Sequence, residues 1–123
     1  MPKKTILVVD DEADILKLIE DLLKPEGYNV VKAQSGADAL KILKKIKPDL
    51  VLLDFFMPKM SGREICEKIR ADKKLKNLKI AFLTIAKFSK IGFKELNRMN
   101  VLDYIKKPFD NEDLIKRVKE MTS

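Results

Sequence analysis

Short apolar runs and amphipathic segments alternate along the whole chain. Five runs rich in β-branched residues are typical of strands: "TILVV" (5–9), "YNVVKA" (28–33), "DLVLLD" (49–54), "LKIAFLT" (78–84) and "VLDYI" (101–105). Their apolar positions are nearly continuous, so both faces of each strand are expected to be buried, as in a parallel sheet.

The segments between these runs have helical spacing. Residues 12–25 place five apolar side chains on one helical face: Ile15, Leu18, Ile19, Leu22 and Leu23. Capping patterns open three further helices, each with an apolar face: Ser35 with Asp38 (Leu40, Leu43, Ile46), Ser61 with Glu64 (Ile65, Cys66, Ile69), and Asp110 with Asp113 (Leu114, Ile115, Val118, Met121). A helix over 87–99 completes the set, although Gly92 interrupts its pattern. Five strands alternating with five helices predict one α/β domain over residues 1–123, with helices on both faces of the sheet.

The composition excludes several kinds of chemistry. The chain has 123 residues, one cysteine and no histidine, so an internal disulfide, a Ser–His–Asp triad, a Cys–His pair and most zinc sites are ruled out. Chemistry must come from Asp, Glu, Lys, Ser, Thr or the backbone. The sequence has neither a signal peptide nor an apolar run long enough to span a membrane, so we expect a cytoplasmic protein without a membrane partner.

The net charge of +7 raises the question of nucleic acid binding. The lysines are distributed over the whole chain, and aromatic residues are not interleaved with them as stacking platforms would require. The charge therefore indicates a solvated basic surface, and we do not expect this domain alone to bind nucleic acid.

Polar residues close four of the predicted strands. The first ends in Asp10 and Asp11, the third in Asp54, the fourth in Thr84, and the fifth is followed by Lys107. The carboxyl ends of parallel strands share one edge of the sheet, so these side chains are expected to converge there.

Each of these residues also fits a structural role when taken alone. Asp11 with Asp14 suits a helix cap, Asp54 suits a turn before Pro58, and Thr84 is common in strands. If these residues only capped helices or formed turns, there would be no reason for all the acids to lie at the same sheet edge as a lysine and a threonine. The convergence therefore favours acids that share a cation.

Oxygen ligands without histidine or thiolate select a hard cation, with Mg²⁺ first and Mn²⁺ second. A cation held against Asp54 can position a phosphoryl group for in-line attack by a carboxylate oxygen. Lys107 would pair with the phosphoryl oxygens, and the Thr84 hydroxyl would donate to them. The product is an aspartyl phosphate, a hydrolysable switch.

Four stretches, "ILVVDDEADIL", "PDLVLLDFFMPKMSG", "FLT" and "DYIKKPF", resemble the receiver domain of two-component response regulators, the CheY-like group. The resemblance covers essentially the whole chain. It implies a doubly wound, flavodoxin-like sheet with strand order 2-1-3-4-5. It also implies a signalling protein that is not a turnover enzyme: a sensor histidine kinase or a histidine phosphotransfer protein supplies the phosphoryl group, and a downstream protein target receives the signal.

The resemblance also implies roles for individual residues. Asp54 is the expected phosphoacceptor, Asp11 a direct Mg²⁺ ligand, Asp10 a ligand mainly through water, and the Phe56 carbonyl a further ligand. Thr84 and Tyr104 resemble the coupled switch pair, and Lys107–Pro108 stands where the family usually has a cis peptide. The expected kinase-docking residues are Ile15, Pro108 and Phe109.

The chain departs from the family pattern in several places: Phe56 is bulky where many relatives are polar, and the spacing from Thr84 to Lys107 is one residue longer than the commonest. Ile85 follows Thr84 where a small residue is usual, which is expected to narrow access to the phosphate. Asn100 stands where Gly is frequent, and Asn tolerates the left-handed conformation that a helix end requires.

Three other functions fit parts of the sequence. An aspartate-nucleophile phosphatase of the haloacid dehalogenase type would want a second Asp at position 56, which is Phe. A flavodoxin-like flavin carrier would offer Ser, Thr and Gly after the first strand, where this chain has acids that repel a phosphate. A non-phosphorylated, metal-binding adaptor of the same fold is the alternative that stays open.

Overall fold

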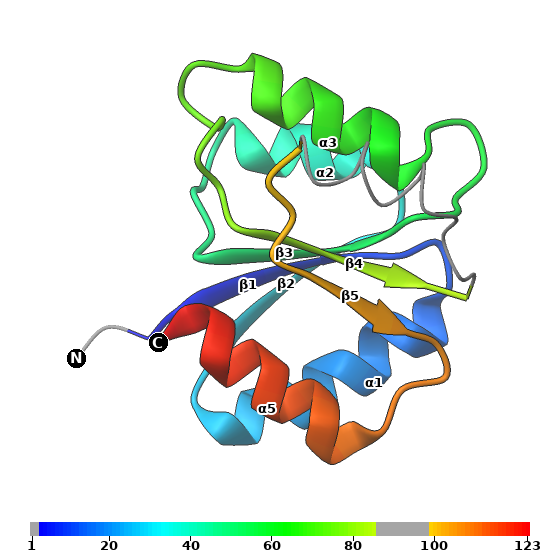
Figure 1. Cartoon of the computed structure of the whole chain (residues 1–123), viewed down its shortest axis with the longest axis vertical. Helices are drawn as coiled ribbons and strands as arrows, with labels where there is room; N and C mark the ends of the chain where they lie inside the picture. Colours follow the sequence, from blue (N-terminus) through cyan, green and yellow to red (C-terminus); the bar gives the residue numbers. More distant parts are fainter. Residues whose placement is uncertain (1–2, 86–98) are drawn as a thin grey trace.

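Figure 1 shows the computed structural model of the chain, which describes residues 3–85 and 99–123. The elements in chain order are β1 (Thr5–Val9), α1 (Ala13–Leu23), the short 3-10 helix η1 (Lys24–Glu26), β2 (Asn29–Ala33), α2 (Gly36–Leu43), β3 (Leu50–Asp54), α3 (Gly62–Ala71), β4 (Ile80–Thr84), β5 (Asp103–Lys106) and α5 (Asn111–Thr122). The helix predicted over 87–99 lies outside the described residues. No helix in the described part of the chain combines the length and apolar character needed to cross a membrane.

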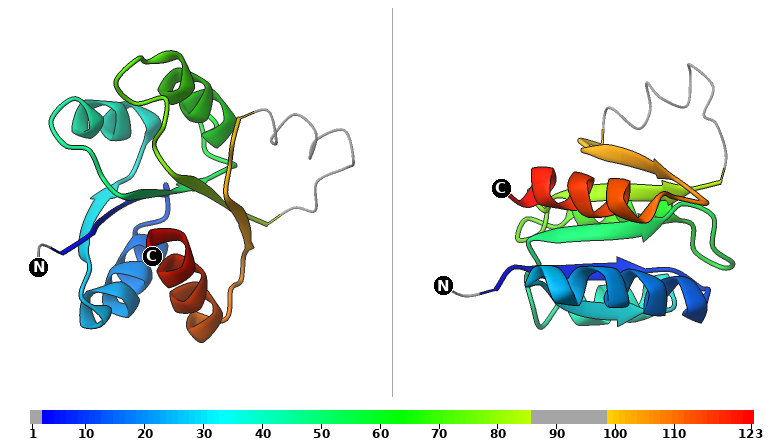
Figure 2. Two further views of the ribbon diagram at one scale, coloured as in Figure 1. Left: turned by 60° about the vertical axis from the view of Figure 1, so that its left-hand side comes forward. Right: turned by 90° about the horizontal axis from the view of Figure 1, so that it is seen from below.

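The five strands form one parallel sheet in the order β2-β1-β3-β4-β5. Helices α2 and α3 cover one face of this sheet, and α1 and α5 cover the other (Figures 1 and 2). The predicted fold class and strand order are thus confirmed. The chain reverses its direction of travel across the sheet at β1, so the carboxyl ends of β1 and β3 flank a topological switch point, where ligands bind in such sheets.

Side chains of β1 alternate between two hydrophobic cores. Leu7 and Val9 join the cluster under α2 and α3, whereas Ile6 and Val8 join the cluster under α1 and α5. Every position of β3 and β4 is buried because helices cover both sheet faces. This double burial is the physical reason for the near-continuous apolar runs in the sequence.

Side-chain caps fix where three of the helices begin. All three predicted capping patterns are confirmed by hydrogen bonds from a backbone N–H to the cap oxygen: Asp38 to Ser35 at 3.1 Å, Glu64 to Ser61 at 3.2 Å, and Asp113 to Asp110 at 2.9 Å. Such caps satisfy backbone donors that the helix itself leaves without a partner.

Two residues assigned to inner helix faces lie outside the core. Leu18 is 37% exposed because the buried stripe of α1 is centred on Leu16, Ile19 and Leu23, and Leu18 lies on another side of the helix. Ile46 is also 37% exposed, because α2 ends at Leu43 and does not carry the apolar pattern further.

Candidate functional site

Asp10 follows β1 directly and is completely buried. Its backbone N–H donates to the Ala33 carbonyl at 3.1 Å, which extends the pairing of β1 with β2 by one residue. Its Oδ1 accepts the backbone N–H of Glu12 at 2.9 Å, and its Oδ2 accepts from Lys107 Nζ at 2.5 Å. Both carboxylate oxygens are therefore hydrogen bonded, which compensates for the cost of burying a charge.

Asp54 is the last residue of β3 and is 4% exposed. Its Oδ1 lies 3.6 Å from Lys107 Nζ and 3.4 Å from the backbone nitrogen of Phe56, both long contacts. Burial, followed by the negative charge of Asp10, raises the pKa of Asp54 from 3.8 to about 6, against the smaller opposing effect of Lys107. Asp54 Oδ1 thus makes longer contacts than the oxygens of Asp10, and the Asp54 carboxylate is more basic than that of an ordinary aspartate.

Lys107 places an ammonium group between these two carboxylates. Its backbone N–H donates to the Thr84 carbonyl at 2.8 Å, which fixes the chain just beyond the end of β5, and the peptide bond to Pro108 is cis. Burial alone would lower the pKa of this lysine, but the hydrogen bond and charge of Asp10 outweigh it, and the net pKa is raised. Lys107 is therefore a cation at neutral pH, held within reach of both acids.

Gly62 allows the first turn of α3 to lie directly against the end of β3. A Cβ at this position would come within 2.4 Å of the Asp54 carbonyl oxygen and 2.8 Å of the Phe55 Cα. The Gly62 N–H also donates to the Phe55 carbonyl at 2.9 Å. The glycine thus permits a close backbone contact that fixes the loop carrying Asp54.

Thr84 ends β4 beside this group and is 3% exposed. Tyr104 lies on the neighbouring strand β5, and its ring stacks on Phe82 with centroids 6.4 Å apart and an angle of 23° between the planes. Burial raises the pKa of the Tyr104 hydroxyl. The structure therefore brings Thr84 to the same sheet edge as Asp54 and Lys107, and it packs Tyr104 into the aromatic cluster behind that edge.

Three acids at the end of β1 form a group that can hold a cation. Carboxylate oxygens of Asp10, Asp11 and Glu12 lie within 4.8 Å of one another. Asp54 is not part of this group. Glu12 was not among the predicted ligands; its place next to the acid pair was the only signal in the sequence. An all-oxygen set with two exposed members suits Mg²⁺, which keeps several of its waters.

The other predicted residues surround this edge. Phe56 is 50% exposed, and its ring meets Phe55 edge to face at 4.8 Å. Ile15 and Phe109 are half-buried and pack against the same hydrophobic cluster, whereas Pro108 is exposed. The predicted ligand role of the Phe56 carbonyl and the docking roles of Ile15, Pro108 and Phe109 stay predictions.

A doubly wound 2-1-3-4-5 sheet whose carboxyl edge gathers acids around a buried lysine defines a CheY-like signalling module. The sequence model of the response regulator receiver domain matches residues 6–119, and the chain belongs to this family. Receiver domains are signalling domains that act through phosphorylation and bind Mg²⁺ in an acidic pocket.

Solved structures agree with this assignment. Chemotaxis protein CheY4 of Vibrio cholerae superposes with a TM-score of 0.90 at 28% identity, covering 98% of this chain and 99% of that one. The N-terminal domain of a response regulator receiver protein from Methanoculleus marisnigri gives a TM-score of 0.80 at 34% identity, covering 94% of each chain.

Among curated relatives, the alkaline phosphatase synthesis transcriptional regulatory protein PhoP of Bacillus subtilis is 38% identical over 116 residues. These cover 94% of this chain and 47% of the relative. The probable transcriptional regulator ycf27 of Porphyridium aerugineum is 35% identical over 98% of this chain and 49% of its own length. The chain thus spans about half the length of these two relatives.

Proposed function

We propose that this chain is a phosphorylation-dependent switch that accepts a phosphoryl group on Asp54 in a Mg²⁺-dependent reaction. The observation that carries the proposal is the Lys107 ammonium, which lies 2.5 Å from one buried carboxylate, Asp10, and 3.6 Å from another, Asp54. A permanent cation beside the less strongly hydrogen-bonded acid is what a newly transferred, doubly charged phosphoryl group requires.

Asp54 is better suited than Asp10 to act as the nucleophile. Both oxygens of Asp10 accept short hydrogen bonds, and the residue is completely buried. The Oδ1 atom of Asp54 makes longer contacts, and the raised pKa of Asp54 marks a carboxylate more basic, and hence more nucleophilic, than that of an ordinary aspartate.

The reaction is a phosphoryl transfer between two proteins. An Asp54 carboxylate oxygen forms a bond to phosphorus while the phosphorus–nitrogen bond of the donor phosphohistidine breaks, and that electron pair returns to the imidazole. Lys107 then pairs with the phosphoryl oxygens, and the Thr84 hydroxyl donates to them. The Phe56 carbonyl, Asp10, Asp11 and Asp54 itself are the proposed Mg²⁺ ligands. A bound Mg²⁺ supplies charge neutralisation and orientation of the phosphoryl group.

Partners follow from the same proposal. A sensor histidine kinase or a histidine phosphotransfer protein docks where α1 meets the loop after β5, at Ile15, Pro108 and Phe109. Ile15 and Phe109 already pack on one cluster, so a partner covering them would bury a continuous apolar strip. Thr84 and Tyr104 then relay the phosphorylated state to a downstream protein. Two relatives are named as transcriptional regulators, which supports a target in gene control for a longer protein of this type.

Intact-mass spectrometry with acetyl phosphate and Mg²⁺ tests this proposal. We expect one labile phosphoryl adduct on the wild type, none on Asp54→Asn, and none when EDTA removes the metal. Asp21→Asn, which changes an exposed acid on α1, is the matched control and should be phosphorylated like the wild type.

If acetyl phosphate gives no adduct, a phosphorylated histidine phosphotransfer protein is tested as a second donor. We expect Ile85, next to Thr84, to narrow access for a small donor, and a docked protein donor would bypass this restriction. Failure with both donors would refute the phosphoryl switch and leave the metal-binding adaptor. An adduct that persists in Asp54→Asn would place the acceptor on another residue.

A further inference from the structure

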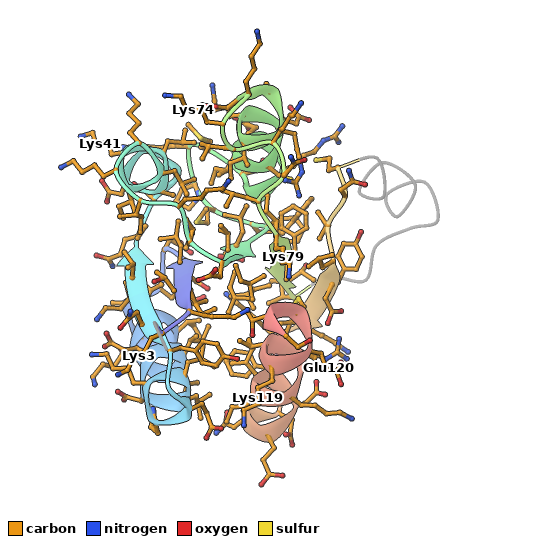
Figure 3. The ribbon with its side chains drawn as sticks, turned by 90° about the vertical axis from the view of Figure 1, so that its left-hand side faces the viewer. Lys3, Lys41, Lys74, Lys79, Lys119 and Glu120 are labelled. Carbon is orange, nitrogen blue, oxygen red and sulfur yellow. The ribbon has the colours of Figure 1, made fainter. Side chains whose placement is uncertain are left out.

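Nine lysines lie in three segments that precede strands of the sheet. Residues 3–4 precede β1, residues 44–49 precede β3, and residues 72–79 precede β4, so all three lie at the amino edge of the sheet. We call this surface the amino-end face; its lysines are Lys3, Lys4, Lys44, Lys45, Lys47, Lys73, Lys74, Lys76 and Lys79. Figure 3 views the molecule from this side, with Lys3, Lys74 and Lys79 labelled along with Glu120.

The three segments hold nine lysines but only two acids, Asp49 and Asp72, and their excess of seven positive charges equals the net charge of the entire chain, +7. Both acids are engaged locally. Asp49 accepts the backbone N–H of Thr5 at 2.7 Å, and Asp72 accepts that of Lys74 at 2.8 Å. The other described residues carry a net charge of −3, so the positive excess of the described part of the chain lies at this end of the fold.

Several lysines elsewhere in the described part of the chain form ion pairs with acids. Lys17 pairs with Asp21 at 2.7 Å, Lys32 with Glu20 at 3.0 Å, and Lys119 with Glu26 at 2.6 Å. On the amino-end face, Lys4 and Lys79 donate to backbone carbonyls at the end of α5. For the other seven, no carboxylate of the described residues lies within 4.0 Å of the ammonium group, and all seven side chains are exposed.

We propose that the amino-end face binds the phosphate backbone of duplex nucleic acid without reading its sequence. Exposed lysines from several loops suit phosphate oxygens and the release of condensed counterions. The face has no arginine with which to read guanine, and Arg70 beside it is occupied by backbone carbonyls, at 2.6 Å to Met99 and 2.7 Å to Leu78.

Other polyanions fit this face less well. A protein interface is depleted in lysine and needs an apolar centre, whereas the exposed large apolar residue among these segments is Ile46, at 37%. A peripheral membrane surface relies on an amphipathic helix or inserted aromatic side chains, and this face consists of loops. Duplex binding would also leave the phosphorylation site open, because a five-residue strand separates the two edges by about 15 Å.

Fluorescence anisotropy of a labelled duplex of mixed sequence tests the inference. We expect binding at about 50 mM salt that weakens steeply by about 200 mM, and six phosphate contacts would give a slope of log K against log salt near −5. The test variant carries Lys44→Gln, Lys45→Gln and Lys47→Gln. It should bind at least tenfold more weakly and reduce the slope by about 3, since each lost phosphate contact removes about 1.

The matched control removes the same charge from exposed lysines on α1, α3 and α5, with Lys17→Gln, Lys68→Gln and Lys116→Gln. It should bind like the wild type. An equal loss in the control would mean that only total charge matters and would overturn the assignment, as would the absence of binding at low salt. Tighter binding to phosphatidylserine vesicles or to polyglutamate would replace nucleic acid by a membrane or an acidic protein. Circular dichroism establishes that both variants fold, and unchanged phosphorylation separates this inference from the proposed switch.

Discussion

Burial of the Asp54 carboxylate predicts that removing its charge stabilises the fold. The rise of the Asp54 pKa from 3.8 to about 6 lowers the free energy of unfolding by about 3 kcal/mol at neutral pH, because each pKa unit corresponds to about 1.4 kcal/mol. The amide group in Asp54→Asn is neutral but still polar, so its burial also carries a free-energy cost, although a smaller one than burial of the carboxylate. We therefore expect the variant to be more stable than the wild type by about 1 to 3 kcal/mol in EDTA.

The sign of the effect depends on pH. The folded-state pKa of Asp54 lies above its unfolded value, so the folded protein binds the proton more tightly than the unfolded chain does. The protonated carboxyl therefore supports the fold below about pH 4, and this contribution is lost as the pH rises through about 6. The stability advantage of Asp54→Asn should thus be largest at neutral pH and shrink toward zero near pH 4.

Urea unfolding of both proteins in EDTA, followed by circular dichroism from pH 4 to pH 7.5, measures this difference directly. Titrating groups remote from Asp54 are common to the two proteins and cancel in the comparison. Asp21→Asn removes an exposed charge and is the control, expected within about 0.5 kcal/mol of the wild type at every pH. A variant no more stable than the wild type at neutral pH, or a difference independent of pH, would show that Asp54 is not strained by its surroundings.

Four further outcomes can be measured. Mg²⁺ at 100 times its dissociation constant should add about 2.7 kcal/mol to the stability of the wild type, and Asp11→Asn should lose most of that gain in a melting experiment. Phe56→Asn should lose the phosphoryl group severalfold faster, because we expect the bulky, half-exposed Phe56 ring to shield the proposed acyl phosphate from water; an unchanged rate by mass spectrometry would refute this. Gly62→Ala should cost about 3 kcal/mol in urea unfolding, since its methyl group meets the backbone at the end of β3. Arg70→Ala should cost about 2 to 4 kcal/mol, with little rescue by lysine, because the guanidinium holds four backbone carbonyls.

The sequence predicted the sheet and three of the helix starts because each rests on local physics. A strand buried on both faces must be apolar throughout, and a serine or aspartate oxygen at a helix start has one preferred partner. The strand order came only from the resemblance to receiver domains. Leu18 and Ile46 were misplaced because a periodic pattern does not fix the exact centre of a buried stripe or the residue at which a helix ends.

The convergence of the site residues was predictable, but the contacts among them were not. Strand ends identify Asp10, Asp54, Thr84 and Lys107 as neighbours, since parallel strands share an edge. The sequence contains no sign that Lys107 lies closer to Asp10 than to Asp54, a difference of 2.5 Å against 3.6 Å. That difference depends on side-chain packing between residues 97 positions apart in the chain, and it distinguishes the strongly hydrogen-bonded Asp10 from the proposed phosphoacceptor Asp54.

The same topology explains why the acids were grouped from the sequence and the lysines were not. In a parallel α/β sheet every loop that follows a strand lies at the carboxyl edge, and every loop that precedes a strand lies at the amino edge. Residues 44–49 and 72–79 are separated in sequence by the whole of β3 and α3, so their lysines look scattered. The fold returns both segments to one edge, just as it gathers Asp10 and Asp54 at the other. In such a protein the charges at each edge of the sheet therefore have to be summed separately. This chain then has an acidic site at the carboxyl edge and a basic surface at the amino edge.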